Sequence, residues 1–138
     1  MKFRSHASCV YRLQYNLVLT TKYRKKVLNK ELSEALFRKV RELLGKWDCI
    51  AIEVNGEEDH IHILFEAHPV LQLSTLVNNL KTVTSRFLRK EYSEYLKQTG
   101  TDSLWNRSYC ILSTGGATID IIKKYIQNQG KERNSSDY

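Results

Sequence analysis

The stretch HIHILFEA at residues 60–67 predicts a strand with one apolar and one polar face. Side chains two positions apart in a strand point to the same side of a sheet. His60 and His62 therefore share one face. The opposite face is apolar and consists of Ile61, Ile63 and Phe65. Pro69 ends the strand because proline has no backbone donor for a sheet. We expect this strand to pack on a core through its apolar face and to display both histidines on the other.

A second alternating stretch, YRLQYNLVLT at residues 11–20, predicts a partner strand. One face of this stretch is apolar and consists of Tyr11, Leu13, Tyr15, Leu17 and Leu19. The other face contains Val18 but is otherwise polar, with Arg12, Gln14, Asn16 and Thr20. Because both stretches have the same alternation, they are suited to one sheet with an apolar and a polar side.

The sequence between these two stretches predicts one helix and one further strand. Asn29 is a suitable N-cap, and apolar residues recur after it at helical spacing as far as Gly45, where we expect the helix to end. Residues 49–55 return to a period of two. The apolar face of that strand consists of Ile50, Ile52 and Val54. The pair Asn55-Gly56 is typical of a hairpin turn, so we expect the chain to reverse there.

Three more elements are expected toward the C-terminus: a helix over 73–90, a strand over 107–113 and a helix over 118–128 with Thr118 as its N-cap. The order β-α-β-β-α-β-α is that of a ferredoxin-like α+β fold with an added C-terminal helix. In that topology the first and third strands are central, and the first two helices cover one face of an antiparallel sheet. The open face is then polar and contains Arg12, Gln14, Asn16, His60, His62 and Glu66.

Length and composition are those of an ordinary globular domain. The chain has 138 residues, of which 41% are hydrophobic and 27% charged. We expect one domain over residues 1–130 and a polar tail over 131–138. No apolar run approaches the roughly 18 residues that span a membrane, and the first ten residues lack the apolar core of a secretory signal. We therefore expect a protein of the cytoplasm with no membrane partner.

The charge balance points to a polyanionic partner. Lys and Arg number 22 against 15 Asp and Glu, which gives a net charge of +7. Such a surface suits DNA, RNA or an anionic membrane, although charge of this kind also serves solubility alone. The cysteines, Cys9, Cys49 and Cys110, lack the spacing of a zinc ribbon or a thioredoxin motif and are typical of reduced thiols.

Two groups of residues are candidates for chemistry. His60 and His62 can hold one divalent ion between them, although two neighbouring surface histidines without an ion are the plainer alternative. Tyr125 and Gln129 lie four positions apart and so share a face of the last predicted helix. Tyr125 either covers the edge of the core or places a phenol beside a metal-bound phosphate. Gln129 would then supply a neutral oxygen ligand one turn away.

These motifs together resemble the single-tyrosine HUH transposases, the small TnpA-like enzymes that move insertion sequences as single-stranded DNA. HUH denotes two histidines around a bulky hydrophobic residue, here His60-Ile61-His62. The resemblance extends over nearly the whole chain. Its segments are VLTTKYRKKVL (18–28), DHIHILFE (59–66), LKTVTSRFLRK (80–90), LWNRSY (104–109) and IIKKYIQNQ (121–129). The HIH triplet alone is a weak signal, and the KYIQNQ segment makes the set specific.

The resemblance implies a mechanism and a set of roles. His60, His62 and Gln129 correspond to the metal ligands of the family, and Tyr125 corresponds to its nucleophile. Tyrosine attack forms a 5′-phosphotyrosine link and frees a 3′-OH, and a 3′-OH from the other end of the element later attacks that link. Two imidazoles and an amide oxygen suit Mn²⁺ at least as well as Mg²⁺. Relatives are homodimers that recognise DNA hairpins, and the tyrosine helix of one subunit can complete the site of the other. A hinge before that helix is expected at Gly115 and Gly116, with a plain turn as an equal alternative.

Contacts with DNA are predicted for two basic segments, with a solvated surface as the alternative for each charge. The first is the loop with Lys22, Arg24, Lys25 and Lys26. The second is the polar side of the 73–90 helix, with Lys81, Ser85, Arg86 and Arg89. Unpaired bases are able to stack on Tyr23 or Trp105, although core packing is the favoured interpretation for Trp105.

Two other functions fit the same sequence. A non-catalytic nucleic-acid-binding module would use the basic surface but has no need of the histidines, Tyr125 and Gln129 together. A hydrolytic metallonuclease would use metal-bound water and form no covalent protein–DNA product. A cupin-like site is disfavoured, because the helices and the scarcity of Gly and Pro argue against an all-β barrel.

Overall fold

The computed structural model describes residues 4–6, 9–115 and 119–129, and its centre is a four-stranded antiparallel sheet. The strands lie in the order β4 (Ile50–Glu57), β5 (His60–Ala67), β3 (Leu13–Thr20) and β6 (Cys110–Ser113). The two stretches expected to be central, β3 and β5, are central, and they pair along their whole length from Leu13↔Ala67 to Thr20↔His60. The predicted α+β fold is confirmed.

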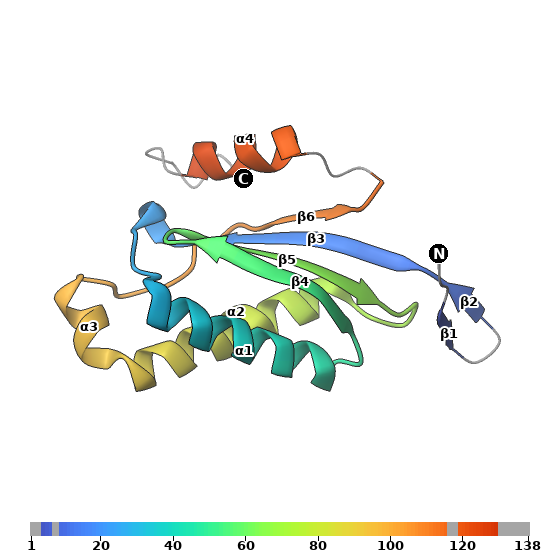
Figure 1. The fold of residues 1–138 in the computed structure, drawn as a ribbon, viewed down its shortest axis with the longest axis horizontal. Helices are drawn as coiled ribbons and strands as arrows, with labels where there is room; N and C mark the ends of the chain where they lie inside the picture. The colour runs from blue at the N-terminus through green and yellow to red at the C-terminus, as the bar shows by residue number, and fades with distance from the viewer. Residues whose placement is uncertain (1–3, 7–8, 116–118, 130–138) are drawn as a thin grey trace.

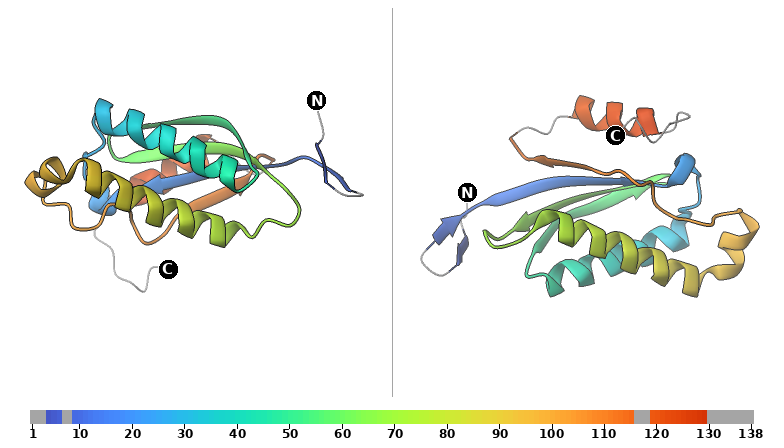
Figure 2. Two further views of the ribbon diagram at one scale, coloured as in Figure 1. Left: turned by 90° about the horizontal axis from the view of Figure 1, so that it is seen from below. Right: turned by 180° about the vertical axis from the view of Figure 1, so that it is seen from behind.

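Helices cover both faces of this sheet (Figure 1). α1 (Lys30–Lys46) and α2 (Leu73–Glu91) lie side by side on one face, as Figure 2 also shows, and the short α3 (Ser93–Gln98) follows α2. α4 (Ile119–Gln129) crosses the opposite face above β3. The expected N-cap Thr118 and the expected hinge residue Gly116 lie outside the described residues, as does the tail over 131–138.

The core lies between the sheet and the first two helices, where the alternation of the strands predicted it. Alternate residues of β3 and β5 are at most 1% exposed there, namely Leu17, Leu19, Ile61, Ile63 and Phe65. The helices contribute Leu36 and Leu44 from α1 and Leu76 and Leu80 from α2, all fully buried. Burial of this kind dominates the stability of the fold. It leaves the other face of the sheet for polar side chains and α4.

The first helix begins as predicted and ends slightly later. The Asn29 side chain accepts a hydrogen bond from the backbone N–H of Leu32 at 2.9 Å, which satisfies one free donor of the first turn. The helix passes through Gly45 and ends at Lys46. The chain then turns through Asp48, which has the left-handed φ of 57°. An aspartate tolerates this conformation better than most residues, so the turn does not need the glycine.

The expected single apolar face of β4 is wrong. The pairing register with β5 shifts between Ala51 and Glu53, which is a β-bulge. An extra residue in one strand reverses the side to which the following side chains point. Ile50 and Ile52 are accordingly 47% and 44% exposed, whereas Val54 is 9% exposed and belongs to the core. Alternation in the sequence does not reveal a bulge.

The expected turn at Asn55-Gly56 is also wrong, because the strand continues through both residues and reverses at Glu58 and Asp59. Gly56 lies opposite Ile61 in the β4–β5 ladder. A Cβ at this position would lie 2.9 Å from the Cα of Ile61 and would clash with the carbonyl oxygen of His60. The glycine therefore permits close approach of two strands rather than a turn.

Replacing Gly56 by alanine is expected to lower the free energy of unfolding by about 1–3 kcal/mol, the usual cost of forcing an extra group into packed backbone. Urea denaturation of the metal-free protein measures it. Gly45→Ala is the matched control, because a Cβ there meets nothing within 4 Å and lies inside a helix. That control is expected to be neutral or stabilising by up to about 1 kcal/mol. Equal stability of Gly56→Ala and wild type would contradict the steric argument.

Several short elements were not predicted. A two-stranded hairpin of β1 (Arg4–His6) and β2 (Cys9–Tyr11) extends from the start of β3, and the 3₁₀ turn η1 (Lys22–Arg24) follows its end. The strand expected over 107–113 is shorter and begins at Cys110. Elements of three residues have too few positions to show a hydrophobic period. Within the described residues, no helix is long and apolar enough to cross a membrane.

Candidate active site

His60 and His62 lie side by side on the face of β5 that α4 covers, opposite Thr20 and Val18 of β3. A groove of about 670 Å³ separates them from the helix. The described residues that line it on the sheet side are Asn55, Gly56, Glu57, His60 and His62. Those from α4 are Ile122, Lys123, Ile126 and Gln127. The predicted sharing of one face by the two imidazoles is observed.

The His60 ring is held by the turn that precedes it. Its Nδ1 lies 2.8 Å from Oδ1 of Asp59, and Oδ2 of Asp59 lies 3.0 Å from Nε of Arg24. Burial acts to raise the pKa of Asp59, but hydrogen bonds and charge from His60 and Arg24 outweigh it, so the pKa is below its usual value. Asp59 is therefore a carboxylate that accepts the proton of His60 Nδ1, which leaves Nε2 of His60 as the nitrogen with a free lone pair.

The His62 ring is held from the neighbouring strand. Its Nε2 donates to Oδ1 of Asn16 at 2.7 Å, so Nδ1 is the nitrogen with a lone pair in the neutral ring. Burial lowers the pKa of His62 below 6.5, and the charge of His60 adds to this, while Glu53 partly opposes it. The ring is therefore neutral near pH 7, which is the form that binds a metal ion.

The free energy of unfolding of the metal-free protein is expected to fall as pH is lowered from about 7.5 to about 5.5. Above the usual imidazole pKa, His62 is neutral in both the folded and the unfolded chain. Below it, the unfolded chain binds a proton that the folded chain takes up only at lower pH, so acid favours unfolding. The contribution stays under about 1.4 kcal/mol per pH unit, the limit for one proton. Urea denaturation at several pH values measures the free energy of unfolding. His62→Gln is expected to reduce its dependence on pH, and an unchanged dependence in that variant would contradict the role of His62.

Tyr125 and Gln129 contact a different part of the structure. The Tyr125 hydroxyl lies 3.1 Å from Oγ of Ser108, which in turn donates to Oε1 of Gln129 at 3.0 Å. Oε1 of Gln129 also accepts a hydrogen bond from Nδ2 of Asn106. Gln129 is only 4% exposed. The two residues therefore share one face of α4, as predicted, and that face contacts the segment before β6.

The groove and the Tyr125–Gln129 face belong to different sides of α4. Neither residue is among the described residues that line the groove beside the histidines. Both lone pairs of the Gln129 amide oxygen accept hydrogen bonds, from Asn106 and from Ser108. One of these must break before the oxygen can bind a metal ion. The structure thus places the two histidines together, whereas Tyr125 and Gln129 contact Asn106 and Ser108 before β6.

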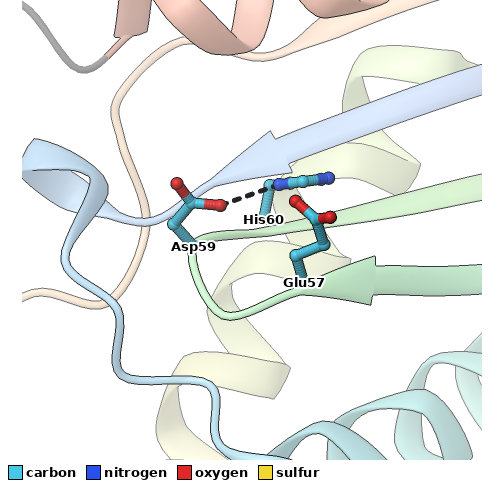
Figure 3. A group of neighbouring side chains, drawn as sticks. All are labelled: Glu57, Asp59 and His60. Carbon is cyan, nitrogen blue, oxygen red and sulfur yellow. Dashed lines mark hydrogen bonds and ion pairs between the residues drawn. The ribbon is translucent and has the colours of Figure 1, made fainter.

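The donors on the sheet suit a divalent metal ion. His60 and His62 each have one nitrogen with a free lone pair, and the exposed carboxylate of Glu57 lines the same groove. Figure 3 shows Glu57 beside His60. Glu57, Asp59 and His60 each offer one ligand atom within 4.8 Å of the other two. Two imidazoles with a carboxylate or amide oxygen form a mixed nitrogen and oxygen set, which fits Mn²⁺ or Mg²⁺.

Comparison with known proteins identifies the family of the chain. The family model for IS200-like transposases matches residues 9–129. The chain belongs to the IS200-like transposase family. It is 32% identical over 120 residues to the ISDra2 transposase TnpA of Deinococcus radiodurans, which covers 87% of this chain and 86% of that protein. It is 28% identical over 129 residues to the transposase for insertion sequence element IS200 of Salmonella typhimurium, with 94% and 84% covered.

A solved structure extends the similarity to three dimensions. The crystal structure of a candidate transposase from Deinococcus radiodurans matches with a TM-score of 0.86 at 30% identity, and the match covers 94% of this chain and 99% of that one. The family predicted from the sequence is thereby confirmed. A transposase cleaves and transfers DNA, so the protein is a DNA-recombining enzyme of an insertion sequence.

In the first basic segment of this transposase, two of the four charged side chains make contacts within the protein. Arg24 contacts Asp59, and Nζ of Lys25 donates to the carbonyl oxygens of Thr99 and Gly100 at 3.3 and 2.7 Å. Lys26 is exposed, and Nζ of Lys22 lies 5.6 Å from the ring centroid of Tyr23. Tyr23 is 69% exposed, so its ring is accessible to a base. Binding of DNA by this loop stays a prediction.

The second basic segment of the transposase lines a groove of about 360 Å³ between α2 and residues 103–107. All four predicted residues line it, namely Lys81, Ser85, Arg86 and Arg89. Trp105 is 6% exposed and donates from Nε1 to Oγ1 of Thr84 at 3.0 Å, so it is a core residue, as favoured. A basic groove of this kind is suited to a phosphate backbone, and its use by DNA stays a prediction.

Asp59, Asn106 and Ser108 support the predicted site residues of this transposase but were not themselves predicted as site residues. Asp59 directly precedes the HIH triplet and is visible in the DHIH segment, but its pairing with Arg24 joins positions 35 apart. Asn106 and Ser108 lie in the LWNRSY segment and contact residues 23 and 17 positions away. A local period does not reveal contacts of this range. The only local signal was the presence of both segments in the motif set.

Proposed function

We propose that this transposase cleaves and rejoins single-stranded DNA at the ends of its insertion sequence through Tyr125 and a divalent metal ion. The main support is the placement of His60 and His62 on the sheet face directly beneath the helix that contains Tyr125 and Gln129. Membership in a transposase family supports the reaction class. The proposed ligands are His60, His62 and Gln129, and a bound Mn²⁺ or Mg²⁺ would polarise the scissile phosphate.

The proposed chemistry conserves the phosphodiester energy. The Tyr125 oxygen loses its proton and attacks the phosphorus, the bond from phosphorus to the 3′ oxygen breaks, and that oxygen leaves as a 3′-OH. The 5′ end stays linked to the protein as a phosphotyrosine. A 3′-OH from the other end of the element then attacks the phosphotyrosine, which joins the strands and frees Tyr125. No water and no nucleotide cofactor are consumed, because each step exchanges one phosphate ester for another.

This chemistry requires α4 to present a different side to the histidines. Tyr125 and Gln129 contact Ser108 and Asn106, so these contacts must break for the proposed site to form. We propose that the rearrangement takes place about Gly115 and Gly116, and that α4 of a partner subunit is able to complete the site in a homodimer. A Cβ on Gly115 would meet nothing within 4 Å, so open space surrounds this position.

Mixing two inactive variants tests the partner arrangement. If α4 acts on the other subunit, a dimer of Tyr125→Phe with His62→Ala contains one site with both histidines and a tyrosine. After subunit exchange half of the dimers are mixed, so about a quarter of the wild-type cleavage sites are expected to be active. A cleavage assay on the single variants and on the mixture measures this recovery. No recovery above the single variants would contradict assembly across subunits.

The proposed DNA partner is single-stranded DNA with a hairpin at each end of the element. The support is the net charge of +7 together with the basic groove beside α2. Contacts with phosphates release counterions, so affinity is expected to fall steeply with salt. Lys81, Ser85, Arg86 and Arg89 are the proposed contacts in that groove, and Lys22, Arg24, Lys25 and Lys26 are those of the loop.

A denaturing gel tests the proposed function. The protein is mixed with labelled single-stranded DNA from the element ends and Mn²⁺, with EDTA in a parallel sample. A labelled band at the mass of the protein is expected with Mn²⁺ and not with EDTA. Cleavage without that band would instead indicate hydrolysis by metal-bound water. DNA binding with neither product would indicate a binding module.

A further inference from the structure

We propose that Asp59 and Arg24 are positioning residues that set the orientation and the tautomer of His60, so that its Nε2 is presented to the metal ion. The inference rests on the proposed role of His60 as a metal ligand. Asp59 and Arg24 would not touch the metal ion. They would determine how well His60 is oriented for the ion. This role differs from a contribution of the Arg24–Asp59 ion pair to the stability of the fold.

His60 is held by a hydrogen bond to the preceding residue. Its Nδ1 lies 2.8 Å from Oδ1 of Asp59, and a carboxylate oxygen only accepts. The proton of the neutral ring is therefore on Nδ1, and the lone pair is on Nε2. A metal-binding histidine typically donates its other ring N–H to a carboxylate or a carbonyl, which fixes the ring and raises its basicity. Figure 3 shows this bond at the end of the β4–β5 hairpin.

Asp59 is itself held in place and is only 6% exposed. Its Oδ2 lies 3.0 Å from Nε of Arg24, so both carboxylate oxygens are hydrogen-bonded to side chains. Its backbone oxygen accepts from the N–H of Thr21 at 2.9 Å and from Oγ1 of Thr21 at 3.2 Å. Glu57, by contrast, is an exposed carboxylate beside the groove. Glu57 is therefore the accessible carboxylate, and Asp59 is the carboxylate that supports His60.

The segment that supplies Arg24 has an unusual backbone conformation. Tyr23 and Arg24 have φ angles of 59° and 52°, in the left-handed region that residues other than glycine rarely adopt. Two successive residues of this kind cost energy, and such conformations persist where the surroundings enforce them. The result is that the guanidinium reaches Asp59. Its Nη1 also lies 3.4 Å from the carbonyl oxygen of Gln127 at the C-terminal end of α4, the negative end of the helix.

The bond from Arg24 to Gln127 connects the support of His60 to the helix of the proposed nucleophile. Arg24 lies between the turn before β5 and the last turn of α4. Loss of its guanidinium would leave Asp59 without one of its two side-chain partners and α4 without this contact. Replacing Arg24 is therefore expected to loosen the His60 ring through Asp59, even though Arg24 does not contact the histidine in the hydrogen bonds described.

The test measures Mn²⁺ affinity and the His60 tautomer rather than cleavage. Asp59→Ala and Arg24→Gln are compared with wild type by isothermal titration with MnCl₂. We expect Mn²⁺ binding to weaken about 10–100-fold in Asp59→Ala, as for lost supporting partners of other metal ligands, and to a smaller extent in Arg24→Gln. Asp59→Asn keeps an oxygen acceptor without the charge and is expected to lie between wild type and Asp59→Ala. Glu58→Gln is the matched control, because it neutralises an exposed carboxylate of the same turn and is expected to bind as wild type.

A second measurement needs no metal. Long-range ¹H–¹⁵N NMR spectra of the metal-free protein report which ring nitrogen of His60 is protonated. We expect Nδ1–H in wild type and a mixture of tautomers in Asp59→Ala. If Asp59→Ala does not fold, Asp59→Asn and Arg24→Gln provide the same comparison, with thermal unfolding as the check on folding.

Each outcome decides one point. Wild-type Mn²⁺ affinity and an unchanged tautomer in folded Asp59→Ala would overturn the positioning role and leave the proposed function intact. Equal weakening in Glu58→Gln would also overturn it, because the effect would then be one of charge alone. Equal Mn²⁺ affinity in wild type and His60→Ala would overturn the ligand role of His60, and with it both proposals.

Discussion

Tyr125→Phe is expected to abolish the covalent protein–DNA product and to lower strand cleavage by at least about 10³-fold. The substitution removes one oxygen, and without it no atom of this side chain can attack phosphorus; losses of this size are usual when a nucleophile is removed. The ring stays, and the substitution removes the 3.1 Å contact of the hydroxyl with Ser108. DNA affinity is expected to stay within a few-fold of wild type. Denaturing gels and filter binding with element-end DNA measure the two effects.

Ser108→Ala is the matched control for this variant. It removes the contact with Tyr125 from the other side, together with the hydrogen bond from Ser108 to Gln129, and leaves the phenol in place. We expect the covalent product to form in Ser108→Ala at a wild-type level or above, since the helix is then less strongly held in the observed arrangement. Full cleavage by Tyr125→Phe would contradict the tyrosine mechanism and favour hydrolysis by metal-bound water.

The second large effect is expected from His62→Ala. The variant removes one of two imidazoles from the metal site, so Mn²⁺ affinity is expected to fall at least about 100-fold and cleavage at least about 10³-fold. Removal of divalent ions from wild type with EDTA should have the same effect on cleavage. Binding of DNA is expected to persist in both cases, because the basic groove lies beside α2. Titration with MnCl₂ and the cleavage assay check the two parts.

His68→Gln serves as the control for His62→Ala. His68 follows β5, and its Nε2 lies 3.2 Å from the carbonyl oxygen of Trp47, away from the residues that line the groove. Its replacement is expected to leave Mn²⁺ affinity unchanged. Mn²⁺-dependent cleavage at the wild-type rate by His62→Ala would contradict the proposed metal site.

The predictions from sequence succeeded where one local rule decides the outcome. The alternation of HIHILFEA places both histidines on one face because consecutive side chains of a strand point to opposite sides. Asn29 begins a helix because its side chain reaches a nearby backbone N–H. The predictions failed at β4, because the bulge after Ala51 and the close approach at Gly56 depend on the partner strand β5. Asn55-Gly56 has turn chemistry, but β5 keeps both residues in the ladder.

Local sequence patterns predicted the central strands, the two covering helices and the shared face of His60 and His62, and the motif set indicated the transposase family. Each of these follows from periods, caps or motifs that are local in the chain. The folded chain was needed to show that Arg24 supports Asp59 and that Ser108 and Asn106 hold Tyr125 and Gln129. Those contacts join residues 17 to 35 positions apart, and they arise only when the sheet and α4 pack together. Packing thus determined which side of α4 faces the histidines, and no local pattern specifies that.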